Sequence, residues 1–286
     1  MTAGPISLQV KSASLRFPPV LASIGIGLVG LVVLLAVFGP WLEPQSPSKL
    51  IGGAFDPPGA TLLGTDVLGR DVFSRLIAGA RLTLFVTAIA TTLGFAVGAI
   101  WGFAAAELRG WFDDITESLV NILLCFPPLM MGLLVVSALS SSLPVLIGAI
   151  AFIQMPRVVR VARSVAINIT TMQYVEVARA RGEGLFSIMI HEILPNSLRP
   201  LGVEYGLRLT YSTLFISGLS FLGLGIQPPD ADWGGLVREN LPGVQLGVYL
   251  PALLPGLAIG LFAVGLNLIV DWLGKEGARP ISEELR

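Results

Sequence analysis

Apolar stretches of membrane-crossing length alternate with polar segments along most of the chain. About 20 predominantly apolar residues are enough for a helix to cross the hydrocarbon core of a bilayer. The pattern therefore predicts an all-α integral membrane protein with six transmembrane helices. The predicted spans are residues 20–42, 82–106, 115–139, 144–165, 198–224 and 250–273.

Polar segments divide the rest of the chain. No small-x-small cleavage site follows the first apolar run, so an uncleaved first span is predicted rather than a signal peptide. Pro127 and Pro128 interrupt the third span and predict a kink. The polar segments are two tails (1–19 and 274–286), a long loop (43–81), a second loop (225–249) and an amphipathic segment (173–197).

Composition supports a membrane protein and excludes several kinds of site. The chain is 53% hydrophobic and 13% charged, with a mean hydropathy of +0.79, whereas soluble domains carry about 25% charged residues. A net charge of −1 argues against a nucleic-acid partner. Cys125 and His191 are the only residues of their types, which excludes an internal disulfide and a two-histidine metal site.

Charge also predicts the orientation. With six spans, both ends of the chain and segment 173–197 share one side of the membrane. Most of the 18 lysines and arginines fall on that side. Basic residues are enriched in cytoplasmic segments, so a multi-pass protein with both termini and segment 173–197 in the cytoplasm is predicted.

Segment 173–197 has an apolar face at helical spacing. Gly182 and Gly184 weaken its middle, which favours two short helices joined by a bend, and Pro195 is expected to end the pattern. Two interpretations follow, a helix that inserts into a groove on a partner protein and a helix on the membrane surface, and periodicity alone favours the second. The apolar face comprises Val175, Ala178, Gly182, Leu185, Phe186 and Met189.

Residues 63–81 are expected to form a loop that enters a short helix along the membrane edge. Gly64 and Gly69 permit a tight backbone there. Asp71 and Arg75 are spaced for an i,i+4 ion pair. The alternative is a solvated loop with a surface helix.

Several charged residues lie inside predicted spans. Glu204 and Arg208 are one turn apart, and a buried pair of this kind is costly unless something compensates for it. A gate or interdomain pair and a pair that locks helices together are equally compatible with the sequence. Residues 157, 160 and 163 are arginines on one face, expected to reach the lipid headgroups.

Two motifs resemble those of one protein family. Glu176, Ala178 and Gly182, followed by Leu194 and Pro195, resemble the E-A-A, G, I-x-L-P loop of ATP-binding-cassette (ABC) importer permeases, although Val177 and Glu192 depart from it. The ending H-E-I-L-P-N is similar to the peptide/nickel branch. The outer loop resembles the G-T-D-x-x-G-R-D-x-x-S-R signature of dipeptide and oligopeptide permeases, at Gly64, Thr65, Asp66, Gly69, Arg70, Asp71, Ser74 and Arg75.

The resemblance implies a type I ABC importer permease in a bacterial inner membrane, with its core over residues 82–273. The implied partners are two ATPase subunits or a fused ATPase, a homologous second permease chain, an extracytoplasmic solute-binding protein and membrane lipid. Segment 173–197 would be the coupling helix that docks on the ATPase. Its implied coupling residues are Glu176, Ala178, Arg179, Gly182, Leu185, Phe186, His191, Leu194 and Pro195.

The chain itself is not expected to hydrolyse ATP, because no G-x-x-x-x-G-K-[S/T] phosphate loop is present. ATP and magnesium would bind to the partner ATPases, and no cofactor or metal is expected in this chain. The implied mechanism is alternating access. Di- and oligopeptides are the default substrates, with nickel chelates, glutathione and heme as alternatives.

Two other function classes are disfavoured. Gly218-Leu219-Ser220 superficially resembles an intramembrane serine protease, but the required histidine base is missing from the spans, since His191 is in the predicted cytoplasmic segment. A channel would need a filter of carbonyl groups or a charged ring, and none is evident.

Overall fold

The computed structural model describes residues 19–59 and 61–277, and the regular elements within these residues are all helical. This confirms the all-α prediction. Outside them fall the predicted tails, except for residue 19 and residues 274–277. The elements are α1 (Val20–Leu42), α2 (Val72–Leu108), α3 (Gly110–Cys125), α4 (Pro128–Leu139), α5 (Leu143–Thr170), α6 (Gln173–Ala180), α7 (Leu185–Ser187), the π-helical turn η1 (Ile188–Ile193), α8 (Leu194–Phe221), α9 (Trp233–Gln245) and α10 (Leu250–Gly277).

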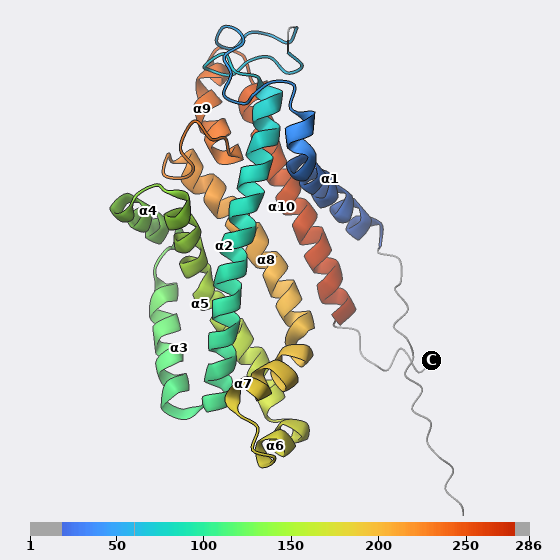
Figure 1. Cartoon of the computed structure of the whole chain (residues 1–286), viewed down its shortest axis with the longest axis vertical. Coiled ribbons are helices and arrows are strands. Elements are labelled where there is room, and N and C mark those ends of the chain that lie inside the picture. Colours follow the sequence, from blue (N-terminus) through green and yellow to red (C-terminus); the bar gives the residue numbers. More distant parts are fainter. Residues whose placement is uncertain (1–18, 60, 278–286) are drawn as a thin grey trace, which may run out of the picture.

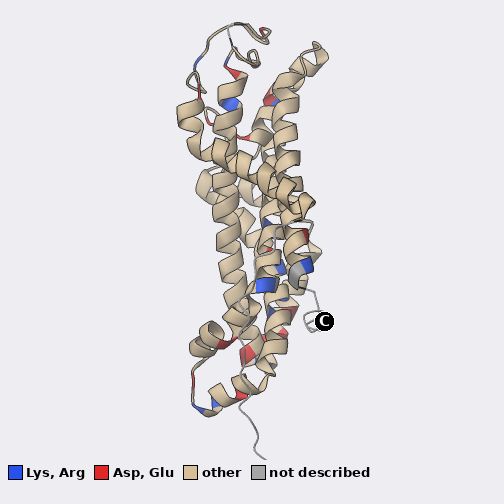
Figure 2. Ribbon diagram, turned by 90° about the vertical axis from the view of Figure 1, so that its right-hand side faces the viewer, with Lys and Arg blue, Asp and Glu red and all other residues tan. Residues whose placement is uncertain are grey.

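The helices form an elongated bundle with different structures at its two ends. The loop that precedes α2 and the helix α9 lie together at one end, here called the loop end, and α6 lies at the other, here called the α6 end (Figure 1). Charged residues gather near the loop end and in the half toward α6, with a largely uncharged stretch of ribbon between them (Figure 2).

Four described helices are long and apolar enough to cross a membrane, namely α1, α2, α5 and the Leu250–Lys275 part of α10. The bent pair α3–α4 makes a fifth if it is counted as one span. Helix α8 has 28 residues but falls outside this set, because Glu204, Arg208 and several serines and threonines lower its hydropathy. The described residues therefore support four or five spans by length and composition, where the sequence predicted six.

The predicted third span is two helices. Phe126 is extended, Pro128 begins α4, and the axes of α3 and α4 differ by 86°. Pro127 and Pro128 were expected to kink one helix. Two consecutive prolines restrict the residues before them to extended conformations, and the chain breaks instead.

The predicted separation between a short helix within residues 63–81 and a span at 82–106 was wrong. Helix α2 runs without interruption for 37 residues, which is about 55 Å at the usual rise per residue. Its N-cap is Asp71 and its C-cap is Arg109, where φ is 53°. One rigid element therefore connects the loop end to the α6 end.

Helix α2 packs closely on α5 through a row of glycines. A Cβ atom on Gly94 would lie 2.5 Å from the Ala151 carbonyl oxygen, and one on Gly102 would lie 2.7 Å from that of Val159. Glycine at every fourth position lets two backbones approach to this distance. The core formed by α2, α5 and α8 continues toward the loop end with Val86, Ile150 and Ile216, all fully buried.

Candidate functional site

The loop end is held together by a group of charges here called the outer network: the buried Asp66, Arg70 and Arg75, and the partly buried Glu239. Asp66 Oδ2 accepts from Arg70 Nε at 2.7 Å and from Arg75 Nη1 at 2.6 Å. Glu239 Oε2, on α9, accepts from Arg70 Nη2 and Arg75 Nη1, each at 2.6 Å. The network joins the loop, the start of α2 and α9.

Asp66 stays ionised in this environment. Its Oδ1 also accepts from the backbone amides of Leu68 and Arg70 at 2.9 Å. Burial would raise the pKa of Asp66, but hydrogen bonds from Arg70 and Arg75 and their positive charges lower it overall. The stabilisation that Asp66 contributes is therefore present above the ordinary aspartate pKa and is lost as the pH falls below it.

The predicted Asp71–Arg75 pair was wrong. Asp71 is the N-cap of α2, where its Oδ2 accepts from the Ser74 amide at 3.0 Å and from the Ser74 hydroxyl at 2.5 Å. An N-cap carboxylate faces the free amides of the first turn, so Arg75 turns to Asp66 and Glu239 instead.

The remaining signature residues shape the loop. Gly64 and Gly69 have φ of 82° and 79°, and a Cβ on Gly69 would lie 2.2 Å from the Gly52 carbonyl oxygen. The Thr65 hydroxyl donates to the Gly53 carbonyl at 2.7 Å and accepts from the Asp56 amide at 2.8 Å. The eight signature residues, Gly64, Thr65, Asp66, Gly69, Arg70, Asp71, Ser74 and Arg75, thus lie in one folded unit.

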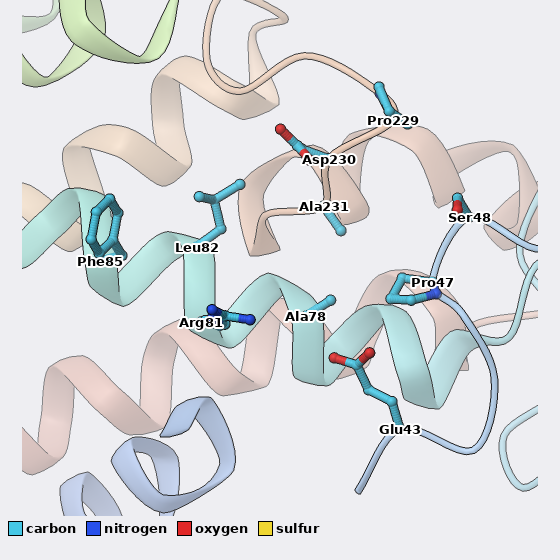
Figure 3. A pocket seen from close by; sticks show the side chains of 10 residues that line it. All are labelled: Glu43, Pro47, Ser48, Ala78, Arg81, Leu82, Phe85, Pro229, Asp230 and Ala231. Atoms are coloured by element: carbon cyan, nitrogen blue, oxygen red, sulfur yellow. The ribbon is translucent and has the colours of Figure 1, made fainter. Parts of the chain in front are cut away.

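A cavity of about 480 Å³ opens beside this unit. Its charged groups, Glu43, Arg81 and Asp230, come from three separate segments (Figure 3). Burial raises the pKa of Glu43, against the lowering effect of Arg81. The cavity therefore offers both signs of charge close to the loop end.

The α6 end contains the segment predicted to couple to a partner. The structure confirms the bend: α6 ends at Ala180, Gly182 has φ of 82°, and α7 begins at Leu185. The predicted single apolar face is divided. Val175 and Ala178 are fully buried, whereas Leu185 is 36% and Phe186 is 73% exposed.

The expectation that Pro195 ends the helical pattern was wrong. The chain continues from α7 through the π-helical turn η1 into α8, and Pro195 lies in the first turn of α8. The π-helical turn just before it is one of the local adjustments by which a continuous helix tolerates a proline. In η1, His191 is exposed, and its Nδ1 lies 3.1 Å from the Ser187 carbonyl oxygen.

Arg179 fastens α6 to the membrane helices. Its Nε and Nη2 donate to the two carboxylate oxygens of Glu107, each at 2.8 Å, and Nη2 also donates to the Thr170 carbonyl at 3.2 Å. The hydrogen bond to Glu107 raises the pKa of Arg179, with burial opposing it. Because Glu107 is in the last turn of α2 and Thr170 ends α5, this bidentate pair is a joint between α6 and both helices.

Glu204 and Arg208 lie in a polar cluster that crosses three helices. Arg208 Nε lies 2.8 Å from Glu204 Oε1, an ion-pair distance without good hydrogen-bond alignment. Arg208 Nη1 donates to Gln154 of α5 at 3.4 Å, and Gln154 Nε2 donates to the Ser212 hydroxyl at 3.2 Å. The hydroxyl of Thr91 on α2 also donates to Ser212, at 2.8 Å. The predicted pair is therefore present, and Gln154 and Ser212 connect it to neighbouring helices.

All three arginines on this face of α5 were predicted to reach the lipid headgroups, but two of them bind residues of the chain instead. Arg160 Nη2 donates to Asn121 Oδ1 at 2.7 Å. Arg163 forms a bidentate pair with Asp113, and its Nη2 lies 3.2 Å from Glu117. These partners are all on α3, so both side chains are bound within the chain.

The sequence matches one described protein family over residues 94–275, the binding-protein-dependent transport system inner membrane component. The chain belongs to this family. It is therefore a transport permease subunit rather than an enzyme. The matched range contains the α6–α7 segment, the Glu204–Arg208 cluster and Glu239, whereas Asp66, Arg70 and Arg75 precede it.

Relatives agree with this assignment along most of the permease. It is 35% identical over 252 residues to a provisionally named peptide transport system permease protein of Brucella suis (87% of this chain, 84% of that protein). It is 33% identical over 258 residues to the dipeptide transport system permease protein DppC of Alkalihalophilus pseudofirmus (88% and 84%). It is 30% identical over 248 residues to the glutathione transport system permease protein GsiD of Pectobacterium atrosepticum (85% and 81%).

Sequence reasoning missed the partners that complete these sites. Glu239 is 169 residues from Arg70, and Glu107 is 72 residues from Arg179. No local pattern identifies either residue as a partner. In the part of the permease that the structure describes, no group of three or more His, Cys, Asp or Glu residues could hold a metal ion.

Asp232 is a buried carboxyl group that caps the first turn of α9 in the permease. Its Oδ2 accepts from the amides of Gly234 at 3.1 Å and Gly235 at 3.2 Å. Burial raises the pKa of Asp232 to about 6, although hydrogen bonds from Ser220, Gly235 and Gly234 lower it. The folded protein therefore binds the proton of the Asp232 carboxyl group more tightly than the unfolded chain does, since aspartates in an unfolded chain titrate near a pH of about 4.

We expect the stability of the permease to fall as the pH rises from about 4 to about 6, by an amount of the order of 2 kcal/mol from Asp232. In that range the unfolded chain has released the proton that the folded protein keeps. Asp232→Asn should flatten this part of the curve when the thermal unfolding midpoint of the purified protein is measured against pH. An unchanged slope in the variant would assign the effect to other carboxyl groups.

Proposed function

We propose that this chain is a permease subunit of an ATP-driven importer that moves di- and oligopeptides across the bacterial inner membrane. The observation that carries the substrate class is the similarity along most of the chain to permeases named for dipeptide, peptide and glutathione transport. Glutathione is itself a short peptide, so it belongs to the same chemical class. Nickel chelates and heme are the alternative substrates.

The α6–α7 segment is proposed as the coupling element that docks on a cytoplasmic ATPase. Its inner side is anchored by Val175 and Ala178, and its outer side presents Leu185 and Phe186. Exposed aromatic residues on a fixed support are typical anchors of protein interfaces. The Arg179–Glu107 joint would carry a movement of α6 into α2 and α5.

The remaining topology follows from this proposal. Both termini lie in the cytoplasm, α8 counts as a span despite its charges, and α3 with α4 counts as one more. ATP and magnesium bind to two ATPase subunits or a fused ATPase. A second, homologous permease chain completes the pathway, and a solute-binding protein delivers substrate to the loop end. Transport by alternating access requires that ATP binding favour one of the two conformations.

The proposed joint makes a prediction about coupling. Arg179→Glu and Glu107→Arg should each reduce ATP-dependent uptake by about tenfold, because each leaves a partly buried charge facing a like charge. The double exchange should recover part of the loss, since opposite charges again face each other. Uptake is measured at matched amounts of membrane-inserted protein. An equal loss in all three variants would contradict the joint.

The substrate class is tested by uptake of labelled di- and oligopeptides in cells that lack this chain. Complementation with the wild type should restore energy-dependent uptake, and the empty vector should not. If peptide uptake never depends on the chain, the peptide assignment fails. The same cells are then tested with nickel chelates and heme.

A further inference from the structure

Arg157 is set apart from the other two arginines on its face of α5. Arg160 and Arg163 are bound by Asn121 and Asp113 on α3. Among the described residues, no carboxylate forms an ion pair with Arg157. Its specific contact is with the ring of Tyr211 on α8, whose centre lies 5.9 Å from the guanidinium carbon.

The same ring holds a second guanidinium group. The guanidinium carbon of Arg208 lies 4.8 Å from the centre of the Tyr211 ring. Glu204, which lies 2.8 Å from Arg208 Nε, is the carboxylate of this group. Two guanidinium groups and one carboxylate leave an uncompensated positive charge at this point.

This cluster opens to the outside of the chain. Tyr211 is 48% exposed and Arg157 is partly exposed, whereas Glu204 and Arg208 are each 7% exposed. The two helices that carry these residues cross the membrane in the proposed topology. Because a free charge is costly against lipid, ionisable groups in spans face water-filled cavities or protein. The open side of the cluster is therefore suited to a polar path.

We propose that Arg157, Arg208 and Tyr211 bind the carboxylate group of the transported peptide as it passes through the membrane. This inference rests on the proposed peptide substrate. Arg157 supplies guanidinium N–H groups that no carboxylate of the described chain occupies, and planar guanidinium groups match carboxylates in geometry and charge. Arg208 is held in place by Glu204 and Gln154, so it can add charge without reorganising.

The test compares uptake of trialanine with uptake of trialanine amide by the complete importer in proteoliposomes with its binding protein. Since all variants share that binding protein, a change in the ratio of the two rates belongs to the permease. Arg157→Gln should reduce uptake of the acid by about tenfold, the effect of losing a hydrogen bond to a charged group, and leave the amide unchanged. Arg157→Lys should recover much of the acid-to-amide uptake ratio that Arg157→Gln loses. Arg160→Gln should keep the wild-type ratio.

Two results would overturn the proposed carboxylate site: an equal loss for acid and amide, as expected if Arg157 pairs with an acidic residue of the second permease chain, and no change for either. A measurement without transport keeps the inference separate from the substrate assignment. Phenylglyoxal modification of Arg157, followed by mass spectrometry, should be slowed by trialanine and not by its amide. If the importer moves neither peptide, the proposed function fails, and the absence of such protection would then reject the carboxylate site as well.

Discussion

Replacing Asp66 by alanine is expected to lower the free energy of unfolding by about 3–5 kcal/mol, the usual effect of removing one partner from a buried ion pair. The Asp66 carboxylate is almost fully buried and neutralises Arg70 and Arg75, which are themselves buried. Without it, two arginines share the single carboxylate of Glu239. The loop before α2 would also lose the hydrogen bonds to the amides of Leu68 and Arg70.

The measurement is thermal unfolding of the purified protein in detergent at neutral pH. Asp230→Ala is a matched control, because Asp230 is an exposed aspartate at the same end of the molecule. The unfolding temperature of Asp66→Asn should fall between those of Asp66→Ala and Asp230→Ala, since the amide oxygen of asparagine still accepts hydrogen bonds but carries no charge. If Asp66→Ala unfolds at the same temperature as Asp230→Ala, the outer network is not a major source of stability.

Gly182→Arg is expected to reduce ATP-driven uptake at least tenfold, about the loss seen when an interface anchor is disrupted, while the protein still inserts in the membrane. A Cβ atom at Gly182 would meet no atom within 4 Å. The cost to the folded chain is therefore limited to the left-handed backbone, about 1–2 kcal/mol. The added bulk and charge would stand beside Leu185 and Phe186, on the surface proposed to meet the ATPase.

Two controls separate the cost of the left-handed backbone from the effect of the added side chain, in uptake assays at matched expression. Gly182→Asn keeps a residue type that tolerates a left-handed backbone and should retain most of the uptake. Gly247→Arg introduces the same side chain where φ is 80° and space is equally open, but at the opposite end of the bundle. Normal uptake with Gly182→Arg would reject the coupling assignment for this bend.

Local patterns predicted the features that depend on neighbouring residues. Gly64 and Gly69 predicted a tight backbone in the loop before α2, and both have positive φ. Gly182 and Gly184 predicted the bend between α6 and α7. These predictions succeeded because a missing Cβ atom and a permissive φ act at the residue itself.

Features that depend on distant residues were missed or mistaken. Arg75 has an acidic neighbour in sequence, Asp71, but that carboxylate is used by the first turn of α2. Its actual partner Glu239 is 164 residues away. In the same way, the sequence does not show that α3 supplies acceptors for Arg160 and Arg163. Backbone features of single residues were therefore predicted more readily than contacts between distant residues.

The proposed role of the α6–α7 segment is tested most directly by site-specific photo-cross-linking from position 186. Phe186 is 73% exposed, so a photoreactive phenylalanine analogue there should be tolerated. Phe85, 54% exposed beside the cavity at the loop end, is the matched position. In membranes that hold the complete importer, position 186 should cross-link to the ATPase and position 85 should not. Cross-linking of position 186 to lipid alone, with none to the ATPase, would contradict the coupling role and favour a helix on the membrane surface.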